Sequence, residues 1–503
     1  MALNAAVEWE IRTTGTATNG GGFKAGASGT DWSQQDAAQY AVTDGVTAGT
    51  TTITSATANF GTDVVGNIIY VQGGSGGIVA DWYEIISRTN STTIVVDRST
   101  GLTAGVGVTL NIGGGLSTLT AVATEVVAGN TVHVKDGTYN ETLTAAVAGG
   151  NGTPIRWLGY AATHNDAPLG ATRPLIDGQS TRANCISVTA TGNSFSYFRL
   201  TGATGNNFTA SATFVTLFCK SSLAGAFGIG TSSNITGIII GCEANNNTTR
   251  GIALTGTSST SYVEYNYSHD NTTDGFILAG GGGGVVIGNI SDSNAGHGFS
   301  IGAVGAFLGN TAYNNTGASS DGFTSGTNGN TFTRAFNNIS ASNGRYGFSR
   351  ASALVPYMIF NWNCYNGNGT AGLNNITAGV NDATVDPIFV DAPNGDFAPG
   401  SNNIIGAGWP GVFPGALSTG YMTIGAVQKA PRSRVFLGSS GKVSMKSIIA
   451  VAVGIIVVGF LFLFSSSREP EPIPIPTPTP TEIVREQSPP RVQEFDRRVI
   501  IVQ

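Results

Sequence analysis

The hydrophobic pattern of the chain repeats with a period of about two dozen residues. A Gly followed by Ile, Phe or Leu recurs at successive spacings of 23, 24, 23, 24, 25 and 25 residues. The glycines of this column are Gly228, Gly251, Gly275, Gly298, Gly322, Gly347 and Gly372. A fixed period of this length is the signature of repeat proteins, in which neighbouring copies stack to bury one continuous core. Each copy is therefore predicted to be one coil of a stack.

Asn occupies two further columns, four and nine residues before the column Gly. The nearer column contains Asn247, Asn271, Asn294, Asn343 and Asn368. The farther column contains Cys219, Cys242, Asn266, Asn289, Asn338 and Asn363. One copy keeps the five-residue step as Asn310 and Asn315 but has three extra residues before Gly322, which predicts a loop insertion.

These columns favour β-strands stacked in parallel over helical repeats. Equivalent residues of successive coils would lie about 4.8 Å apart, so that Asn amides hydrogen-bond along the stack and apolar rings fill its interior. The copies are rich in Gly and Asn, which are poor helix formers. We therefore predict an all-β, right-handed, single-stranded parallel β-helix of roughly ten coils between residues 130 and 375. Cys219 and Cys242 are expected to be stacked free thiols.

Other elements are expected before the coils. Ser117–Val127 has the apolar spacing of one helix face and is predicted to cap the stack. Five short apolar runs within Thr50–Gly114 predict a small β-barrel or sandwich. The predicted domains are a loop arm at 1–45, the small β domain at 46–114, the β-helix with its capping helix and closing segment at 115–428, a basic linker at 429–446, a transmembrane helix at 447–465 and a Pro-rich tail at 466–503.

The span Ser447–Phe464 contains no charge and no Pro. A membrane-spanning helix needs roughly 17–25 apolar residues, so this stretch qualifies, with a buried core helix as the alternative. Lys and Arg concentrate on its N-terminal side, and the positive-inside rule then places residues 1–446 on the cytoplasmic side. The N-terminus lacks the basic start and apolar run of a secretory signal, which agrees. Residues from Met445 onward also resemble the start of a separate, fused reading frame.

Composition excludes several classes of function. Charged residues make up 11% of the chain and the net charge is −6, so there is no electrostatic reason to expect nucleic-acid binding. None of the four Cys forms a Cys-x-x-Cys pair, which argues against a zinc site. We expect no cofactor and no metal.

Three segments resemble known β-helix proteins. "GNTVHVKDGTYNETL" (Gly129–Leu143) looks like the first-coil motif of right-handed parallel β-helix repeat proteins. "DPIFVDAPNGDFAPGSNNIIGAG" (Asp386–Gly408), ending in "TIGAVQ" (Thr423–Gln428), resembles the closing segment of choice-of-anchor Q proteins. The N-terminal "WEIRTTGTATNGGGF" with the small β domain is similar to β-helix structural or tailspike-like proteins of tailed bacteriophages. The resemblance implies a surface-exposed or virion-associated protein carrying an anchor after residue 428.

Polar residues also fall in register along the repeat. The position just before the column Gly holds Arg250, Asp274, His297, Asp321 and Tyr346. Six residues before that Gly lie Asn245, His269 and Asp292. Carboxylates and imidazoles stacked in this way could supply an acid and a base for cleavage of a sugar bond, and an Arg could hold a uronate.

The alternative is that polar residues simply fill turn positions. Gly296-His297-Gly298 resembles a tripeptide of polygalacturonases, but the Asp-Asp and Arg-x-Lys motifs of those enzymes are missing near the stack. We therefore assign no catalytic residue. The candidates, should there be activity, are Asp274, His297, Asp321 and Asp292. The expected ligand-contacting strip is Arg250, Asp274, His297, Asp321 and Tyr346.

The sequence thus favours a virion-associated, membrane-tethered β-helix spike or fibre that contacts a host surface or glycan. Its expected partners are the membrane, through residues 447–465, a host-surface glycan and other virion proteins, and a homo-oligomer stays open. Two alternatives remain. One is a polysaccharide lyase or glycosidase on the same scaffold, and the other is an anchored adhesin at a bacterial cell surface.

Overall fold

The structure is a computed structural model of the chain. It describes residues 7–24, 40–101, 103–150, 152–231, 235–256, 261–278, 284–302, 306–325, 334–350, 359–409 and 423–428. The predicted basic linker, membrane span and Pro-rich tail lie outside the described residues. Within the described residues, no helix is both long and apolar enough to cross a membrane.

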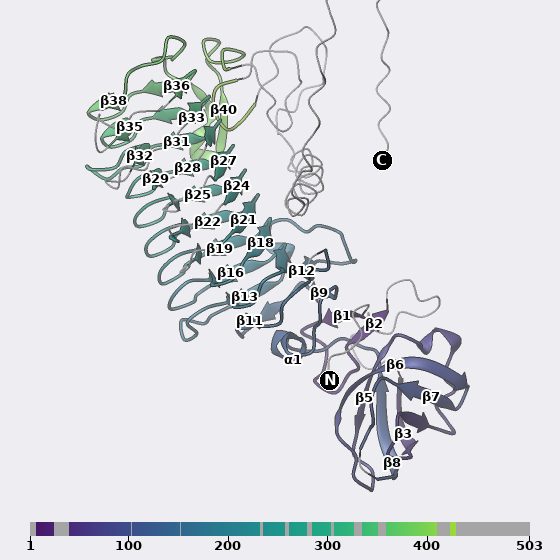
Figure 1. The fold of residues 1–503 in the computed structure, drawn as a ribbon. Coiled ribbons are helices and arrows are strands. Elements are labelled where there is room, and N and C mark those ends of the chain that lie inside the picture. Colours follow the sequence, from purple (N-terminus) through teal and green to yellow (C-terminus); the bar gives the residue numbers. More distant parts are fainter. Residues whose placement is uncertain are drawn as a thin grey trace, which may run out of the picture. The chain divides into compact units, whose positions relative to one another are not determined.

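Three sheets of stacked strands form the main body of the described chain (Figure 1). Sheet I contains, in spatial order, β2 (Gly22–Lys24), β1 (Val7–Ile11), β9 (Thr131–Lys135), β12 (Ile155–Tyr160), β15 (Asn193–Ser196), β18 (Phe214–Leu217), β21 (Gly237–Ile240), β24 (Tyr262–Glu264), β27 (Val285–Ile287), β30 (Ala306–Leu308), β33 (Arg334–Phe336) and β36 (Ile359–Asn361). Sheet II contains β10 (Thr138–Tyr139), β13 (Leu175–Asp177), β16 (Arg199–Thr201), β19 (Lys220–Ser222), β22 (Glu243–Asn245), β25 (Tyr267–His269), β28 (Ile290–Asp292), β31 (Thr311–Tyr313), β34 (Ile339–Ala341) and β37 (Cys364–Asn366). Sheet III contains β11 (Leu143–Ala145), β14 (Ile186–Val188), β17 (Phe208–Ala210), β20 (Ile229–Thr231), β23 (Ile252–Leu254), β26 (Phe276–Leu278), β29 (Phe299–Ile301), β32 (Phe323–Ser325), β35 (Tyr346–Arg350) and β38 (Ala371–Asn374).

Each coil contributes one strand to each sheet, and each strand pairs in parallel with the equivalent strand of the next coil. Tyr267 pairs with Ile290 and His269 with Asp292, for example, without any shift in register. Nine such steps separate the ten strands of sheet II, so the stack has about nine turns, close to the predicted ten. The predicted fold class, an all-β parallel β-helix, is confirmed.

The apolar column of the sequence lies inside the stack. The rings of Phe276, Phe299, Phe323 and Phe348 are fully buried and stack nearly parallel to one another, with successive centroids 4.6, 4.7 and 4.7 Å apart. This spacing equals the strand separation of a sheet, which is why a residue repeated once a coil stacks on its own kind. Cys219 and Cys242 are both buried and unpaired as disulfides, next to this core.

The two Asn columns form continuous ladders at the turns. In the nearer ladder each Nδ2 donates to the Oδ1 of the next coil over 2.8–3.0 Å, in the order Asn247, Asn271, Asn294, Asn315, Asn343 and Asn368. The farther ladder repeats this geometry through Asn266, Asn289, Asn310, Asn338 and Asn363. Asn310 and Asn315 keep their places, so the three extra residues do lie in a loop.

The ends of the stack depart from the predicted layout in one respect. The capping helix forms as α1 (Leu119–Ala123), with Leu119, Val122 and Ala123 buried. The interpretation of residues 1–45 as a loop arm, however, is wrong. β1 pairs in parallel with β9 and extends sheet I, because the alternation in "VEWEI" buries Trp9 completely while Glu8 faces outward.

The small β domain is a closed antiparallel barrel. Its strands, in spatial order, are β3 (Tyr40–Thr47), β4 (Thr52–Thr54), β7 (Thr93–Val96), β6 (Asp81–Asn90), β5 (Ile68–Gln72) and β8 (Gly105–Ile112). The five predicted runs all form strands. β3 is a sixth, which places the start of the barrel at Tyr40 instead of 46.

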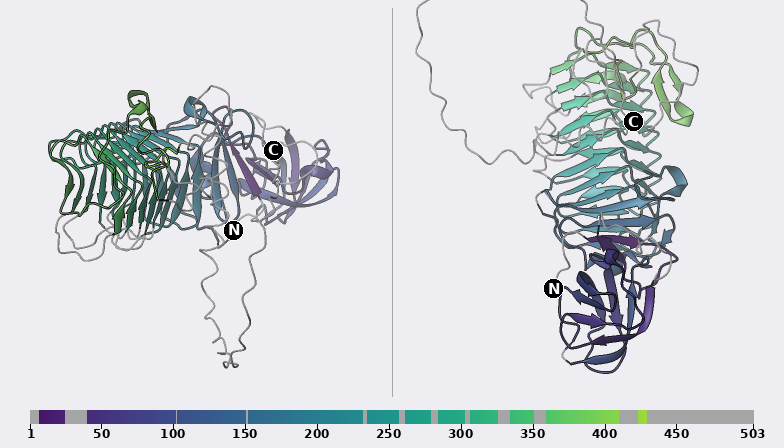
Figure 2. Two further views of the ribbon diagram at one scale, coloured as in Figure 1. Left: turned by 90° about the horizontal axis from the view of Figure 1, so that it is seen from above. Right: turned by 90° about the vertical axis from the view of Figure 1, so that its right-hand side faces the viewer.

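The closing segment returns over the outer face of sheet II. Ile404 and Ile424 pack on Ile339 and Cys364 of that sheet. A hairpin of β39 (Phe389–Asp391) and β40 (Asp396–Pro399), joined by a short 3-10 turn η4 (Ala392–Asn394), stands beside it (Figure 2). Two further 3-10 turns are η2 (Thr62–Val64) and η3 (Gly170–Thr172).

Candidate functional site

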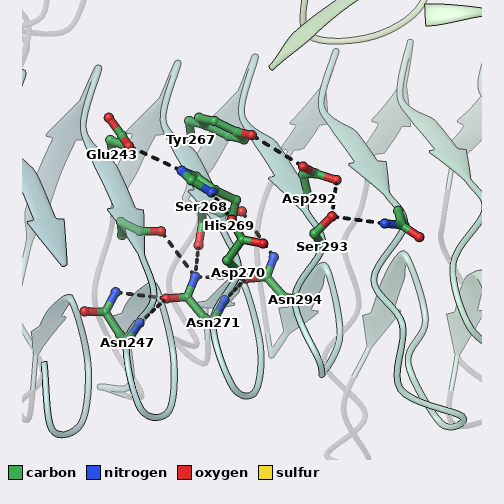
Figure 3. Close-up of polar contacts among 12 residues, drawn as sticks. Glu243, Asn247, Tyr267, Ser268, His269, Asp270, Asn271, Asp292, Ser293 and Asn294 are labelled. Carbon is green, nitrogen blue, oxygen red and sulfur yellow. Dashed lines mark hydrogen bonds and ion pairs between the residues drawn. The ribbon is translucent and has the colours of Figure 1, made fainter. Parts of the chain in front are cut away.

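A cluster of ionisable and aromatic side chains lies on the outer face of sheet II, on β22, β25 and β28. Side chains of a strand alternate between the two faces of the sheet. The central residue of each of these strands is small and buried inside the coil: Ala244, Ser268 and Ser291. The flanking residues therefore point outward, and they bring Glu243, Tyr267, His269 and Asp292 onto one face (Figure 3).

His269 is held between two carboxylates. Its Nε2 lies 3.3 Å from Oε1 of Glu243, and its Nδ1 lies 2.6 Å from Oδ2 of Asp270. Lys220 Nζ donates to the same Oε1 of Glu243 over 2.7 Å. Two of these groups face solvent substantially, since the side chain of Asp270 is 51% exposed and that of Glu243 is 32% exposed.

Tyr267 links this group to a second carboxylate. Its ring stacks on the imidazole of His269, with centroids 4.1 Å apart and an angle of 20° between the planes. Its hydroxyl donates to Oδ2 of Asp292 over 3.4 Å, while the Ser293 hydroxyl donates to Oδ1 over 2.9 Å. The aromatic pair thus lies between Glu243 and Asp292 (Figure 3).

The pKa values of Glu243 and Asp292 are shifted in opposite directions. Burial would raise the pKa of Glu243, but the hydrogen bonds and positive charges of His269 and Lys220 outweigh it and lower the pKa to about 2. Burial raises the pKa of Asp292 to about 6, and the charge of Asp270 adds to the shift. Burial acts to lower the pKa of His269, yet Glu243 and Asp270 raise it overall. Near neutral pH the cluster therefore combines an ionised carboxylate with an acid that still holds its proton in part.

A cavity lies further along the same sheet, toward the end of the stack. Asp292 pairs with Tyr313 on the next strand, and Tyr313 begins the lining of a cavity of about 330 Å³. The cavity lies between sheet II and the hairpin, where Phe389 and Phe397 pack edge-on against the Tyr313 ring. Its other lining residues are Ala341, Ser342, Asn366, Asp386, Ile388, Val390, Asp391, Ala392 and Pro393.

The polar strip predicted from the sequence is also present, but at the turn leading into sheet III. Arg250 Nε lies 3.5 Å from Oδ2 of Asp274, and Oδ1 of Asp274 accepts the backbone N–H of His297 over 2.8 Å. His297 Nδ1 accepts the backbone N–H of Asp321 over 3.0 Å. The side chains of Arg250, Asp274, His297 and Asp321 therefore lie in one column, as the repeat predicts.

Asp321 shows how this column is used. Its carboxylate is fully buried, and both oxygens receive bonds from Arg345, each over 2.7 Å. Oδ1 also accepts the backbone N–H of Tyr346 over 3.2 Å. The acceptors of the strip therefore hold neighbouring coils together. Its role in contacting a ligand stays a prediction.

The sequence singled out Asp292 and noted His269 in its column, but missed Glu243 and Tyr267. Those two belong to a neighbouring column, two residues earlier on their strands. They occupy the first outward position of β22 and β25, where the repeat shows no fixed polar type. The signal that could have found them is the strand period of two, which puts Glu243 beside Asn245 and Tyr267 beside His269 on one face. Among the described residues, no group of three or more His, Cys, Asp or Glu could hold a metal ion.

No protein-family model and no curated protein matches this chain. Solved structures with a similar fold include a pectate lyase, Pel9A, at 16% identity and a TM-score of 0.41, with 62% of this chain and 90% of that one covered. A rhamnogalacturonan lyase aligns at 15% identity and a TM-score of 0.37, covering 55% and 86%. The Dettilon tailspike protein aligns at 13% identity and 0.24, covering 50% and 56%. These neighbours are right-handed parallel β-helix proteins, and the likeness is one of fold.

Proposed function

We propose that the protein is a virion-associated, membrane-tethered β-helix that recognises a glycan with the outer face of sheet II. One observation carries this proposal: the stacked rings of Tyr267 and His269 lie on an outer sheet face between the carboxylates of Glu243 and Asp292. Ligand sites commonly combine aromatic surface with a few well-placed polar groups.

The chemistry of this face suits a polyhydroxylated ligand. A sugar ring presents an apolar face that packs on an aromatic ring, and its hydroxyls donate to carboxylates in charge-assisted hydrogen bonds. Tyr267 provides the ring, which also contacts Phe397 of the hairpin with centroids 6.0 Å apart. Glu243 and the half-exposed Asp270 provide carboxylate acceptors. Lys220 beside Glu243 adds a donor.

A cavity lies further along the same face of sheet II. The outward column runs through His269, Asp292 and Tyr313 and then enters the cavity beneath the hairpin. A ligand with several sugar units could occupy both parts, since neighbouring strands lie about 4.8 Å apart. This length favours an oligosaccharide over a single sugar.

The tether and the location are proposed from the sequence. The uncharged span at 447–465 would insert in a membrane with residues 1–446 on the cytoplasmic side. The phage-like N-terminal segment supports association with other virion proteins, as a monomer or a homo-oligomer. Immunogold labelling should therefore mark virus particles, whereas labelling confined to cell envelopes would favour an adhesin.

Glycan recognition is tested with the purified full-length chain in detergent on an array of acidic and neutral oligosaccharides. Tyr267→Ala should weaken binding at least about tenfold, because the stacking surface is lost. Asp177→Asn is a matched control, since it changes an outward carboxylate at the end of β13, far along the same sheet. Equal binding by Tyr267→Ala and the unchanged protein would contradict the proposal.

A further inference from the structure

Exposed apolar side chains gather at the last coil of the stack. Among the described residues, eleven large hydrophobic side chains are exposed, and five of them fall within residues 359–409. In the coils between Leu223 and Ile359 the described residues include none. Ile359 is 57% exposed, Val380 92% and Trp409 40%. Single exposed hydrophobic residues are normal, but a group of them marks a surface that contacts something other than water.

Three contacts bring these side chains to one corner of the last coil, at β36, the final strand of sheet I (Figure 1). Oδ1 of Asn361 on β36 accepts the backbone N–H groups of Trp362 and Asn381, each over 2.9 Å. The half-buried ring of Trp362 lies against that of Trp409, with centroids 6.4 Å apart. The terminal patch is defined as Ile359, Trp362, Val380 and Trp409.

The chain leaves the described part of the molecule beside this patch. Asn337 binds Trp409 twice: its Oδ1 accepts the backbone N–H over 2.7 Å, and its Nδ2 donates to the carbonyl over 3.3 Å. The backbone carbonyl of the same Asn337 accepts the N–H of Gly425 over 2.6 Å. The described chain ends shortly afterwards, at Gln428. The predicted basic linker at 429–446 therefore starts next to the terminal patch.

The charge of the linker complements an anionic lipid surface. Residues 429–446 contain no Asp or Glu. Their five basic residues are Lys429, Arg432, Arg434, Lys442 and Lys446. Basic segments next to a membrane span are attracted to the anionic lipids of the cytoplasmic leaflet. Trp side chains concentrate at the same depth, because the indole has an apolar body and a polar N–H.

We propose that the terminal patch rests on the surface of the membrane that holds the chain, with Trp362 and Trp409 among the lipid headgroups. The inference rests on the proposed membrane tether and adds a second contact to it. The linker binds anionic headgroups beside the patch, and Ile359 and Val380 enter the edge of the acyl region. The last coil then faces the bilayer.

This orientation has a consequence for glycan recognition. Four strand spacings separate β25 from β37 of the last coil, which is about 19 Å. Tyr267 on β25 would therefore lie clear of the lipid headgroups. A patch at the middle of the stack would instead bring the outer face of sheet II to the membrane.

The test uses the full-length protein reconstituted into vesicles of phosphatidylcholine and phosphatidylglycerol whose acyl chains are brominated. Bromine quenches Trp fluorescence on contact, and the span at 447–465 contains no Trp. We expect quenching relative to vesicles of unbrominated lipid. Trp409→Phe should remove at least about a third of it, because one of two interfacial rings is lost. Trp82→Phe is the matched control, since Trp82 lies on β6 of the barrel, and its quenching should equal that of the unchanged protein.

A second pair of variants leaves every Trp in place. Ile359→Ser combined with Val380→Ser should lower the quenching at least about twofold, because the patch loses apolar surface that favours insertion. Leu223→Ser is the control, since Leu223 is 63% exposed but lies in a turn outside the patch, and it should have no effect. Vesicles without phosphatidylglycerol should give weaker quenching, because the linker loses its anionic partner.

The other outcomes separate this inference from the tether. A full-length protein that does not float with the vesicles would overturn both. Flotation without quenching would overturn the docking of the patch and leave the tether standing. Quenching that is unchanged in Trp409→Phe and in the Ile359→Ser, Val380→Ser protein would also overturn the docking. Chemical cross-links between patches of two chains, without quenching, would assign the patch to a second copy instead.

Discussion

Asp321 and Asp292 are buried carboxylates of the same stack, one coil apart, and the protein treats them in opposite ways. Asp321, in the turn column, receives two bonds from Arg345 and one from the Tyr346 backbone. Among the described residues, the carboxyl group of Asp292, on the outer face of sheet II, accepts hydrogen bonds from two hydroxyls. A buried charge is costly unless it is paired and hydrogen-bonded. Arg345 forms such a pair with Asp321, whereas burial raises the pKa of Asp292 to about 6.

The contrast teaches which polar residues of a solenoid hold it together and which are available for chemistry. In the turn column and the Asn ladders, hydrogen-bond acceptors receive N–H groups of the neighbouring coil. On the outer face the carboxylates of Glu243 and Asp292 meet partly buried side chains, and their pKa values move apart. Paired carboxylates whose environments separate their pKa values are typical of acid–base sites.

The largest effect is expected where the polar residues are most fully bonded. Asn294→Ala removes an amide that donates to Ser268, Ser291 and Asn315 and that accepts two bonds from Asn271. The buried groups left without partners should lower the free energy of unfolding by about 3 kcal/mol, as measured by urea titration. Asn374→Ala is the control, because its amide makes a single bond to Ser349 in the last coil. Equal losses for both variants would contradict a ladder that carries stability.

Asp321→Asn should be the next most damaging change. The amide cannot accept both Arg345 bonds, and the ion pair is lost beside a buried turn. We expect a loss of about 2 kcal/mol in the free energy of unfolding at neutral pH, with glycan binding retained. A variant as stable as the unchanged protein would contradict a stabilising role for the Asp321–Arg345 ion pair.

Asp292→Asn should have the opposite sign at neutral pH. The folded pKa of Asp292, about 6, lies above its ordinary value of 3.8, so the folded state binds the proton more tightly. The stability that this proton confers is complete below about pH 3.8 and is lost as the pH rises through about 6. Removing the charge should therefore raise the free energy of unfolding by about 1 kcal/mol at pH 7. Urea titrations of both proteins between pH 4 and 8 check this, and a destabilised variant at pH 7 would count against it.

Glu243 provides the mirror image of that experiment. Its folded pKa, about 2, lies below the ordinary value of 4.5, so its contribution is present above pH 4.5 and is lost as the pH falls toward 2. Glu243→Gln should therefore lower stability at pH 7 and leave it nearly unchanged near pH 2. Screening by solvent limits the change to about 1 kcal/mol or less, because a third of the side chain is exposed.

The smallest effect is expected from Tyr267→Phe. The hydroxyl contact to Asp292 is 3.4 Å long and lowers the pKa of that carboxyl slightly against the larger effect of burial. Its removal should raise the pKa of Asp292 slightly and leave the free energy of unfolding within about 0.5 kcal/mol of that of the unchanged protein. NMR titration of the Asp292 carboxyl measures this pKa in both proteins. A lower pKa in the variant would contradict the assigned contact.

Much of the fold could be predicted because one physical period controls it. A strand spacing repeated once a coil forces Asn271 over Asn294 and Phe276 over Phe299, so a single alignment of the sequence yields the stack, its interior and its ladders. The same reasoning could not find β1, which joins sheet I from 120 residues away and belongs to no repeat copy. Long-range pairing of that kind has no periodic signal in the sequence.

For a related reason, only part of the candidate site could be predicted from the repeat. Asp292 and His269 share a column of the repeat, but Glu243 and Tyr267 belong to a neighbouring column whose other member on β28 is Ile290. Function here depends on what differs between coils, whereas the periodicity shows only what they share. The pKa of Asp292 depends further on burial, which no spacing of residues reveals.

Each ladder also has a direction. Every side-chain amide donates a hydrogen bond to the following coil, so each coil requires an acceptor on the next one. At the last coil of the farther ladder, the backbone N–H of Asn363 donates to the carboxylate of Asp382. At the other end of this ladder the backbone N–H of Cys242 donates to Asn266. Deleting or duplicating one whole period between the two ends would therefore preserve the hydrogen bonds at both ends of the ladder. The number of coils can thus change while the residues at either end stay the same.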